Sequence, residues 1–222
     1  MTDLPRLLLI ADGFASGRGS GPHAQTPERV RKLAAVAVAA GVRWVMLRDH
    51  EADAPTFLRA AARLTERLRD MRSGVRITIN TRADVARRLR ADLHVGTRGP
   101  EVAEAVRLGR EFGGLVGVSA HSAREVTEAE QAGADYATVS PVYRTATHPE
   151  AEPAGLNLIR QSAEAAPGFP ILALGGLTPS RVEACLDAGA HGVAVLSAIL
   201  DAHRPTRAVE QFLSALAGAA AS

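Results

Sequence analysis

His121 is the residue of this sequence best suited to move a proton. It stands in the stretch SAHSAREV (119–126), directly after the apolar run LVGV. Ser122 and Glu125 have the S-x-x-E spacing of a capping box, which predicts a helix that begins there. His121 would then precede the helix, whose positive end favours the neutral imidazole that acid/base catalysis uses. The alternative is a helix-entry residue that only lines a pocket.

Two turns, one with a pair of glycines and one with a serine, predict a phosphate site. LALGGLTPSRV (172–182) and AVLSAIL (194–200) each carry a short apolar run into a turn. Thr178 and Pro179 then read as the N-cap and first residue of a helix. Backbone N–H groups at such turns bind anions, although glycine can also be required for steric reasons alone. The residues that we assign to this phosphate site are Gly175, Gly176, Leu196 and Ser197.

The hydroxyl-rich segment SPVYRTATH (140–148) is long for a connection between a strand and a helix. Thr145 and Thr147 could complete the phosphate site, or the segment could close over it as a lid. A surface excursion is the alternative. Other polar residues follow predicted strands and are candidates for substrate contacts. These are Arg48, Asn80 and Ser119, with His50, Thr81 and His148 as further possibilities.

The histidines near predicted strand ends do not indicate a metal site. His50, His94 and His148 have no consistently placed carboxylate, and their spacing matches no zinc pattern. We therefore expect no bound metal. His94 lies inside the apolar stretch ADLHVG, which is typical of a core histidine whose hydrogen bonds are satisfied.

A repeated unit indicates how these residues are positioned. VAAGVRWVMLR (38–48), EQAGADYATVS (130–140) and LDAGAHGVAVLS (186–197) each pass from a helix end through Ala-Gly into a short apolar strand. Gly41, Gly133 and Gly189 therefore read as left-handed residues that end helices. The alternation predicts βα units with a parallel sheet.

Eight such units fit the 222 residues and predict a (β/α)8 TIM barrel that forms one domain over 1–222. A doubly wound open sheet is the alternative, and the glycine-rich stretch 12–25 reads as a mobile loop. The strands are expected near 6–11, 43–48, 75–79, 92–95, 115–119, 135–140, 170–174 and 191–196. The helices are expected near 27–40, 53–70, 82–90, 99–111, 122–132, 155–165, 178–187 and 205–219.

Composition excludes several classes of function. The net charge is +2 with scattered arginines, so we expect no nucleic-acid partner. Apolar runs are shorter than the roughly 18 residues of a membrane span, and no signal peptide opens the chain. One cysteine, Cys185, forms no intrachain disulfide, and Lys32 is the only lysine, which disfavours Schiff-base chemistry. We expect a cytoplasmic protein with a small phosphorylated substrate. A homodimer is one possible assembly.

Seven segments together resemble the thiamine-phosphate synthase/TenI family of barrels over nearly the whole chain. The resemblance implies a TIM barrel that binds a thiazole phosphate. It is carried by VMLRDH (45–50), INTRADVA (79–86), ADLHVG (91–96), GVSAHSAREVTEAEQAGADY (117–136), SPVYRTATH (140–148), PILALGGLTP (170–179) and AHGVAVLSAI (190–199).

The family holds two activities, and this sequence departs from the synthase pattern. Synthases join a pyrimidine diphosphate to thiazole phosphate with Mg²⁺, using Gln-x-Arg-x-Lys after strand 2. They also carry Asn-Asp after strand 3, an acidic residue after strand 4 and a lysine in the strand-6 loop. Of these, the sequence keeps Arg48 and Asn80. The differing positions are Met46, His50, Thr81, Gly99 and His148.

The resemblance therefore favours the TenI-like branch, a thiazole tautomerase that needs no cofactor. It implies His121 as the acid/base group, with Arg48 holding a substrate carboxylate bidentately. One alternative is a thiamine-phosphate synthase with Mg²⁺ on Asp12, Asp49 or Glu101. Another is a non-catalytic regulator that binds thiazole phosphate.

Overall fold

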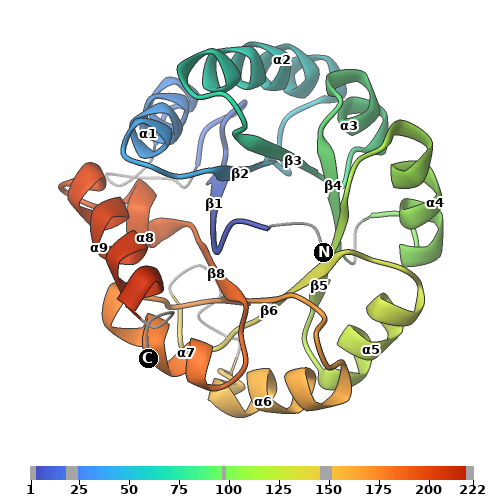
Figure 1. Ribbon diagram of the computed structural model, residues 1–222. Helices are drawn as coiled ribbons and strands as arrows, with labels where there is room; N and C mark the ends of the chain where they lie inside the picture. Colours follow the sequence, from blue (N-terminus) through green and yellow to red (C-terminus); the bar gives the residue numbers. More distant parts are fainter. Residues whose placement is uncertain (1–3, 19–24, 97–98, 146–151, 219–222) are drawn as a thin grey trace.

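The strands of the computed structural model close into a parallel barrel in sequence order, with β1 paired to β8 (Figure 1). The structure describes residues 4–18, 25–96, 99–145 and 152–218. This closed sheet confirms the expected (β/α)8 fold over the open-sheet alternative. The strands are β1 (Leu7–Asp12), β2 (Trp44–Arg48), β3 (Arg76–Asn80), β4 (Asp92–Val95), β5 (Val116–Ala120), β6 (Tyr136–Val139), β7 (Ile171–Leu174) and β8 (Gly192–Val195).

Helices surround the barrel as an outer ring (Figure 1). The strands are buried on both faces, as their nearly continuous apolar sequences predict. The helices are α1 (Pro27–Ala39), α2 (Ala54–Met71), α3 (Ala83–Leu89), α4 (Val102–Phe112), α5 (Ala123–Gln131), α6 (Gly155–Ala165), the 3-10 helix η2 (Pro179–Arg181), α7 (Val182–Asp187), α8 (Ser197–Leu200) and α9 (Pro205–Gly218). None of these helices is long and apolar enough to cross a membrane.

Glycines end three helices where the repeated unit predicts them. Gly41, Gly133 and Gly189 all have positive φ, which confirms the expectation for the Ala-Gly motif. Space is also limiting at two of them. A Cβ at Gly41 would lie 2.8 Å from Leu213 Cδ1, and one at Gly189 would lie 2.6 Å from Ala163 Cβ. These glycines let each helix turn sharply into the next strand.

Three expectations for the elements need correction. The helix expected over 178–187 begins as the 3-10 helix η2 and becomes α7 only at Val182. The short helix α8 was not predicted, because four residues are too few for a periodic pattern. The helix expected from 99 begins at Val102, after Gly99 and Pro100.

The described parts of the 12–25 stretch contact other parts of the barrel, and the mobility expected of the stretch stays a prediction. Ala15 and Ser16 donate backbone hydrogen bonds to Asp49, and Arg18 pairs with Gln25 in an antiparallel bridge. Gln25 also donates to the Leu200 carbonyl oxygen at 2.8 Å. The glycine content of the stretch could not predict the contacts with Asp49 and Leu200, because these residues are distant in the sequence.

Candidate active site

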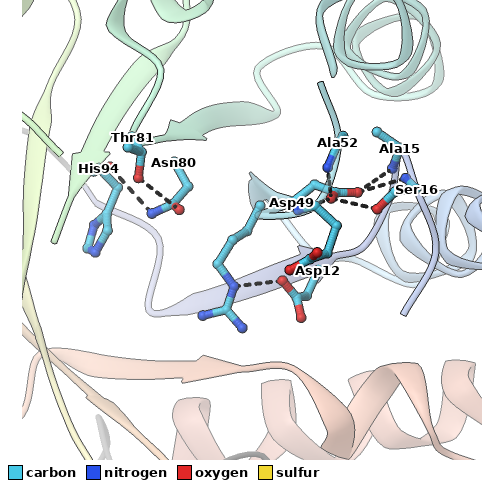
Figure 2. A network of polar contacts seen from close by, with 10 residues as sticks. Asp12, Ala15, Ser16, Asp49, Ala52, Asn80, Thr81 and His94 are labelled. Carbon is cyan, nitrogen blue, oxygen red and sulfur yellow. Dashed lines mark hydrogen bonds and ion pairs between the residues drawn. The ribbon is translucent and has the colours of Figure 1, made fainter. Parts of the chain in front are cut away.

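Asp12 and Arg48 form an ion pair at the carboxyl ends of β1 and β2. The two residues are in register on neighbouring strands, and Arg48 Nε lies 2.8 Å from Asp12 Oδ1 (Figure 2). The side chains are 19% and 21% exposed, so the pair borders the barrel mouth. Within the described residues, no acceptor is bonded to the two terminal nitrogens of Arg48. They can therefore bind a substrate carboxylate.

Asp49 holds two loops together at the same end of the barrel. Its carboxylate accepts hydrogen bonds from Ser16 Oγ at 2.7 Å, Ser16 N at 2.8 Å and Ala15 N at 3.0 Å. It also accepts from the backbone N–H groups of Glu51 and Ala52 (Figure 2). Burial alone would raise the pKa of Asp49, but the hydrogen bonds from Ser16, Ala15 and Ala52 lower it below its usual value.

Asn80 and Thr81 lie beside His94 across the mouth from this aspartate network (Figure 2). Thr81 N donates to the His94 carbonyl oxygen at 2.7 Å, and Thr81 Oγ1 donates to Asn80 Oδ1 at 3.2 Å. Thr81 has a φ of 69°, a left-handed conformation that β-branched residues rarely adopt. Such strain is typical of functional sites, and Thr81 is one of the residues that the sequence offers as a possible site residue.

His94 is a core histidine, as the sequence predicts. It is 2% exposed, and both ring nitrogens have partners: Nδ1 is 3.1 Å from the Tyr136 hydroxyl and Nε2 is 2.9 Å from Ser119 Oγ. Burial, with a smaller contribution from Arg48, lowers the pKa of His94 to about 3. The imidazole is therefore neutral at pH 7, and it links the core to the partly exposed Ser119.

His121 precedes α5 and reaches towards the end of β6. Its Nδ1 lies 2.7 Å from the Ser140 carbonyl oxygen, and the imidazole is exposed. Ser122 Oγ accepts a hydrogen bond from Glu125 N, which confirms the N-cap. Glu125 Oε2 accepts from the backbone N–H of His121 rather than from that of Ser122. The capping motif therefore fixes the backbone of His121 directly.

The expected phosphate turns lie after β7 and β8. Gly175 and Gly176 have φ values of +103° and +61°. A Cβ at Gly176 would lie 2.4 Å from the Arg144 carbonyl oxygen, so the glycine is needed for the close approach of the β6 loop. Leu196 and Ser197 lead into α8. The steric alternative for the glycines thus has direct support, and their role in phosphate binding stays a prediction.

Several other predicted residues have more limited descriptions. Thr178 occupies the expected N-cap position, but its hydroxyl bonds to Ser180 Oγ rather than to the helix backbone. His50 and Thr145 interact with other residues of the protein. Thr147 and His148 lie outside the described residues. The predicted lid over 140–148 is therefore described only up to Thr145.

Tyr136, whose hydroxyl contacts His94, was not among the residues predicted from the sequence. Tyr136 is fully buried, and its ring lies over Gly117, where a Cβ would be 2.0 Å from Tyr136 Cζ. Gly117 and Tyr136 are partners in the β5–β6 register. A glycine facing an aromatic residue on the next strand was the available signal, but it acquires meaning only once the register is known.

The carboxylates that the sequence offers for Mg²⁺ are engaged by other groups or exposed in the described residues. They contain no group of three or more His, Cys, Asp or Glu side chains placed to hold a metal ion. Of the alternatives proposed from the sequence, Asp12 pairs with Arg48 and Asp49 is occupied by N–H and O–H donors. Glu101 is exposed at the start of α4. Magnesium bound with phosphates takes one or two carboxylates, so a site of that kind would have to draw Asp12 or Asp49 away from these contacts.

Comparisons with known proteins identify the family. Residues 20–199 match the family model for thiamine monophosphate synthase. The chain is 37% identical over 185 residues to the thiamine-phosphate synthase of Thermus thermophilus, covering 83% of this chain and 87% of that protein. It is 39% identical over 177 residues to the bifunctional protein ThiM/ThiE of Symbiobacterium thermophilum, covering 78% of this chain and 36% of that longer protein.

A solved structure agrees on the fold. Thiamine phosphate pyrophosphorylase from Pyrococcus furiosus superposes with a TM-score of 0.80, covering 96% of each chain at 22% identity. The names of these relatives match the synthase alternative better than the tautomerase that we expected first. The matched family model and the length of the shared sequence show that this chain belongs to the thiamine monophosphate synthase family.

Proposed function

We propose that this member of the family binds a thiazole phosphate at the barrel mouth and catalyses a metal-independent proton shift on the ring. The observation that carries the proposal is the 2.7 Å contact between His121 Nδ1 and the Ser140 carbonyl oxygen. A carbonyl oxygen can only accept, so Nδ1 carries the proton in the neutral imidazole. Nε2 is then left with its lone pair, as a general base requires.

The remaining groups at the mouth suit such a substrate. The terminal nitrogens of Arg48 can take the carboxylate of an unaromatised thiazole, since only Nε is engaged by Asp12. The turns at Gly175–Gly176 and Leu196–Ser197 are candidates for the phosphate. His121 Nε2 would remove a proton from the ring and return it at another ring position. The reaction moves one proton within the substrate and involves no net oxidation or reduction.

A second candidate is a thiamine-phosphate synthase, and the names of the relatives favour it. Arg48, Asn80 and Ser119 keep polar groups at the mouth, where they could bind a diphosphate. Against this candidate stands the donor set, which places Thr81 where a metal-binding aspartate is expected. We place the proton shift first because its acid/base group has the required geometry, whereas Asp12 and Asp49 are already engaged by Arg48 and by N–H and O–H donors.

Two assays on the same purified protein decide between the candidates. In the first, the unaromatised thiazole carboxylate phosphate is supplied with EDTA, and the aromatic product is followed by its absorbance. In the second, the pyrimidine diphosphate and thiazole phosphate are supplied with Mg²⁺, and thiamine phosphate is measured. We expect turnover only in the first assay. Turnover only in the second would establish the synthase, and calorimetric binding of thiazole phosphate without turnover would indicate a regulator.

A further inference from the structure

A chain of polar contacts runs through the barrel interior to the mouth. Trp44 Nε1 donates to Thr78 Oγ1 at 2.8 Å, and the Trp44 ring packs edge-on against Tyr136. Tyr136 Oη lies 3.1 Å from His94 Nδ1, and His94 Nε2 lies 2.9 Å from Ser119 Oγ. Four of these side chains are fully or almost fully buried, whereas Ser119 is partly exposed. The chain therefore connects a closed interior to the site.

The protons of this chain can be arranged in two ways, because a neutral imidazole has one donor and one acceptor nitrogen. In the first, Tyr136 donates to His94 Nδ1, and His94 Nε2–H donates to Ser119 Oγ. The Ser119 proton then points into the mouth. In the second, every bond is reversed: Ser119 donates to Nε2, and Nδ1–H donates to Tyr136. Ser119 would then offer the mouth only lone pairs.

The Tyr136 hydroxyl decides between the arrangements because it is fully buried and its proton needs an acceptor. In the first arrangement that proton is donated to His94 Nδ1, 3.1 Å away. In the reversed arrangement the Tyr136 oxygen accepts from Nδ1–H instead. The Tyr136 proton would then have no acceptor among the hydrogen bonds of the described residues. A buried unpaired donor costs about 1–3 kcal/mol, so the first arrangement is favoured.

We propose that His94 and Tyr136 are positioning residues that hold Ser119 as a hydrogen-bond donor towards an anionic oxygen of the bound substrate. The inference rests on the proposed function only in taking the barrel mouth as the substrate site. It does not depend on which reaction occurs there. The anionic oxygen could belong to a carboxylate or to a diphosphate, since both accept from a hydroxyl.

Packing gives this arrangement independent support. The Tyr136 ring occupies space that Gly117 leaves open, and Trp44 meets the ring edge-on with centroids 4.7 Å apart. The phenol is thus fixed beneath His94 rather than free to rotate away. Burial also raises the pKa of Tyr136, so its hydroxyl keeps its proton and remains a donor.

The direct test locates the proton on His94 in the unmodified protein. Long-range ¹⁵N–¹H correlation spectra of ¹⁵N-histidine-labelled protein distinguish the two tautomers, and His94 is recognised as a neutral ring that does not titrate between pH 7.5 and 5. We expect the proton on Nε2. A proton on Nδ1 would overturn the proposal. This measurement needs no turnover. It can therefore contradict the role of His94 while the proposed function stands, or support that role while the proposed function fails.

A double-mutant cycle tests whether Tyr136 acts through Ser119. Binding of inorganic pyrophosphate and of thiazole carboxylate is measured by calorimetry, which also shows which anion Ser119 serves. We expect Ser119→Ala to weaken binding of one of them about tenfold and Tyr136→Phe about threefold. In the Ser119→Ala background, Tyr136→Phe should have no further effect. An equal loss in both backgrounds would show a general structural effect and overturn the proposal.

Thr138→Val is the matched control for this cycle. Thr138 faces Ser119 in the β5–β6 register, and its buried hydroxyl has no partner among the described residues. Valine removes that hydroxyl and leaves the shape almost unchanged. We expect anion binding to change less than about 1.5-fold, because no bond of the chain is lost. A loss as large as that of Tyr136→Phe would show that any change beside Ser119 weakens binding, and would overturn the proposal.

Discussion

The two halves of the barrel mouth are built differently. At the ends of β1 to β5, which we call the side-chain half, side chains are joined by hydrogen bonds and ion pairs, including Asp12 with Arg48, and His94 with Ser119. At the ends of β7 and β8, which we call the backbone half, the predicted site consists of two glycines and the turn into α8. Side chains can be exchanged to change chemistry, whereas backbone turns can only be kept or lost. The difference suggests that the first half sets the reaction and the second holds a feature shared by the substrates.

The largest loss of stability is expected at Gly176, where the backbone half leaves the least space for a Cβ. In Gly176→Ala, the new Cβ would meet the Arg144 carbonyl oxygen at 2.4 Å, and φ would remain at +61°. Strain and overpacking together should lower the free energy of unfolding by about 4 kcal/mol. Gly168→Ala is the control, since φ is +83° but no described atom lies within 4 Å of its Cβ. It should cost about 1 kcal/mol, and equal losses in urea unfolding would refute the steric argument.

The next effect concerns pH and belongs to the side-chain half. Folding lowers the pKa of His94 from its usual 6.5 to about 3, so the unfolded chain binds a proton between these values and the folded chain does not. The stability from this group is therefore present above pH 6.5 and is lost as pH falls. It should amount to about 3 kcal/mol between pH 7 and pH 4.

His94→Gln provides the comparison, because an amide does not titrate. Unfolding by urea at pH 7, 5.5 and 4 should show a shallower loss for this variant than for the unmodified protein. Carboxylates contribute equally to both proteins, so the difference isolates His94. Parallel curves would mean that His94 is protonated in the folded state, which would contradict its buried neutral assignment.

A smaller effect is expected at Asp49, which holds the loops of the side-chain half. Asp49→Asn removes the charge and leaves the N–H donors of Ala15 or Ala52 facing an NH₂ group. The free energy of unfolding should fall by about 2 kcal/mol. Asp53→Asn is the control, because Asp53 caps α2 through a bond from Thr56 N and asparagine caps equally well. Similar losses in both variants would show that the buried network has no special weight.

Much of the fold could be predicted from the sequence because its signals are local. Ala-Gly before an apolar run marks a helix end and the following strand, and Gly41 and Gly133 have the expected positive φ. Capping at Ser122 is local too, and so is the placement of His121 just ahead of α5. Each of these features depends on residues within one turn of each other.

The parts of the site that could not be predicted from the sequence depend on contacts between residues far apart in the chain. The Tyr136–His94–Ser119 contacts join three strands and exist only once the barrel closes in its register. The Asp12–Arg48 pair spans 36 positions for the same reason. The left-handed Thr81 could not be foreseen either, since threonine disfavours that conformation and the strain is imposed by its surroundings.

The smallest effect is expected at Thr81 and has the opposite sign. Thr81→Asn places a residue that tolerates positive φ at 69° and keeps a polar group beside Asn80. Relief of strain should raise the free energy of unfolding by about 1 kcal/mol. Thr56→Asn, on the first turn of α2, serves as the control and should not stabilise the protein. A destabilised Thr81→Asn would show that the threonine methyl group packs productively.

His121 is the residue that we propose to move the proton at this mouth without a metal ion. The most direct measurement is the rate at which the unaromatised thiazole carboxylate phosphate becomes aromatic in the presence of EDTA, compared between the unmodified protein and His121→Ala. We expect turnover in the unmodified protein and a loss of about 10²–10⁴-fold in the variant, the usual contribution of a general acid/base group. An undiminished rate in His121→Ala would contradict this role.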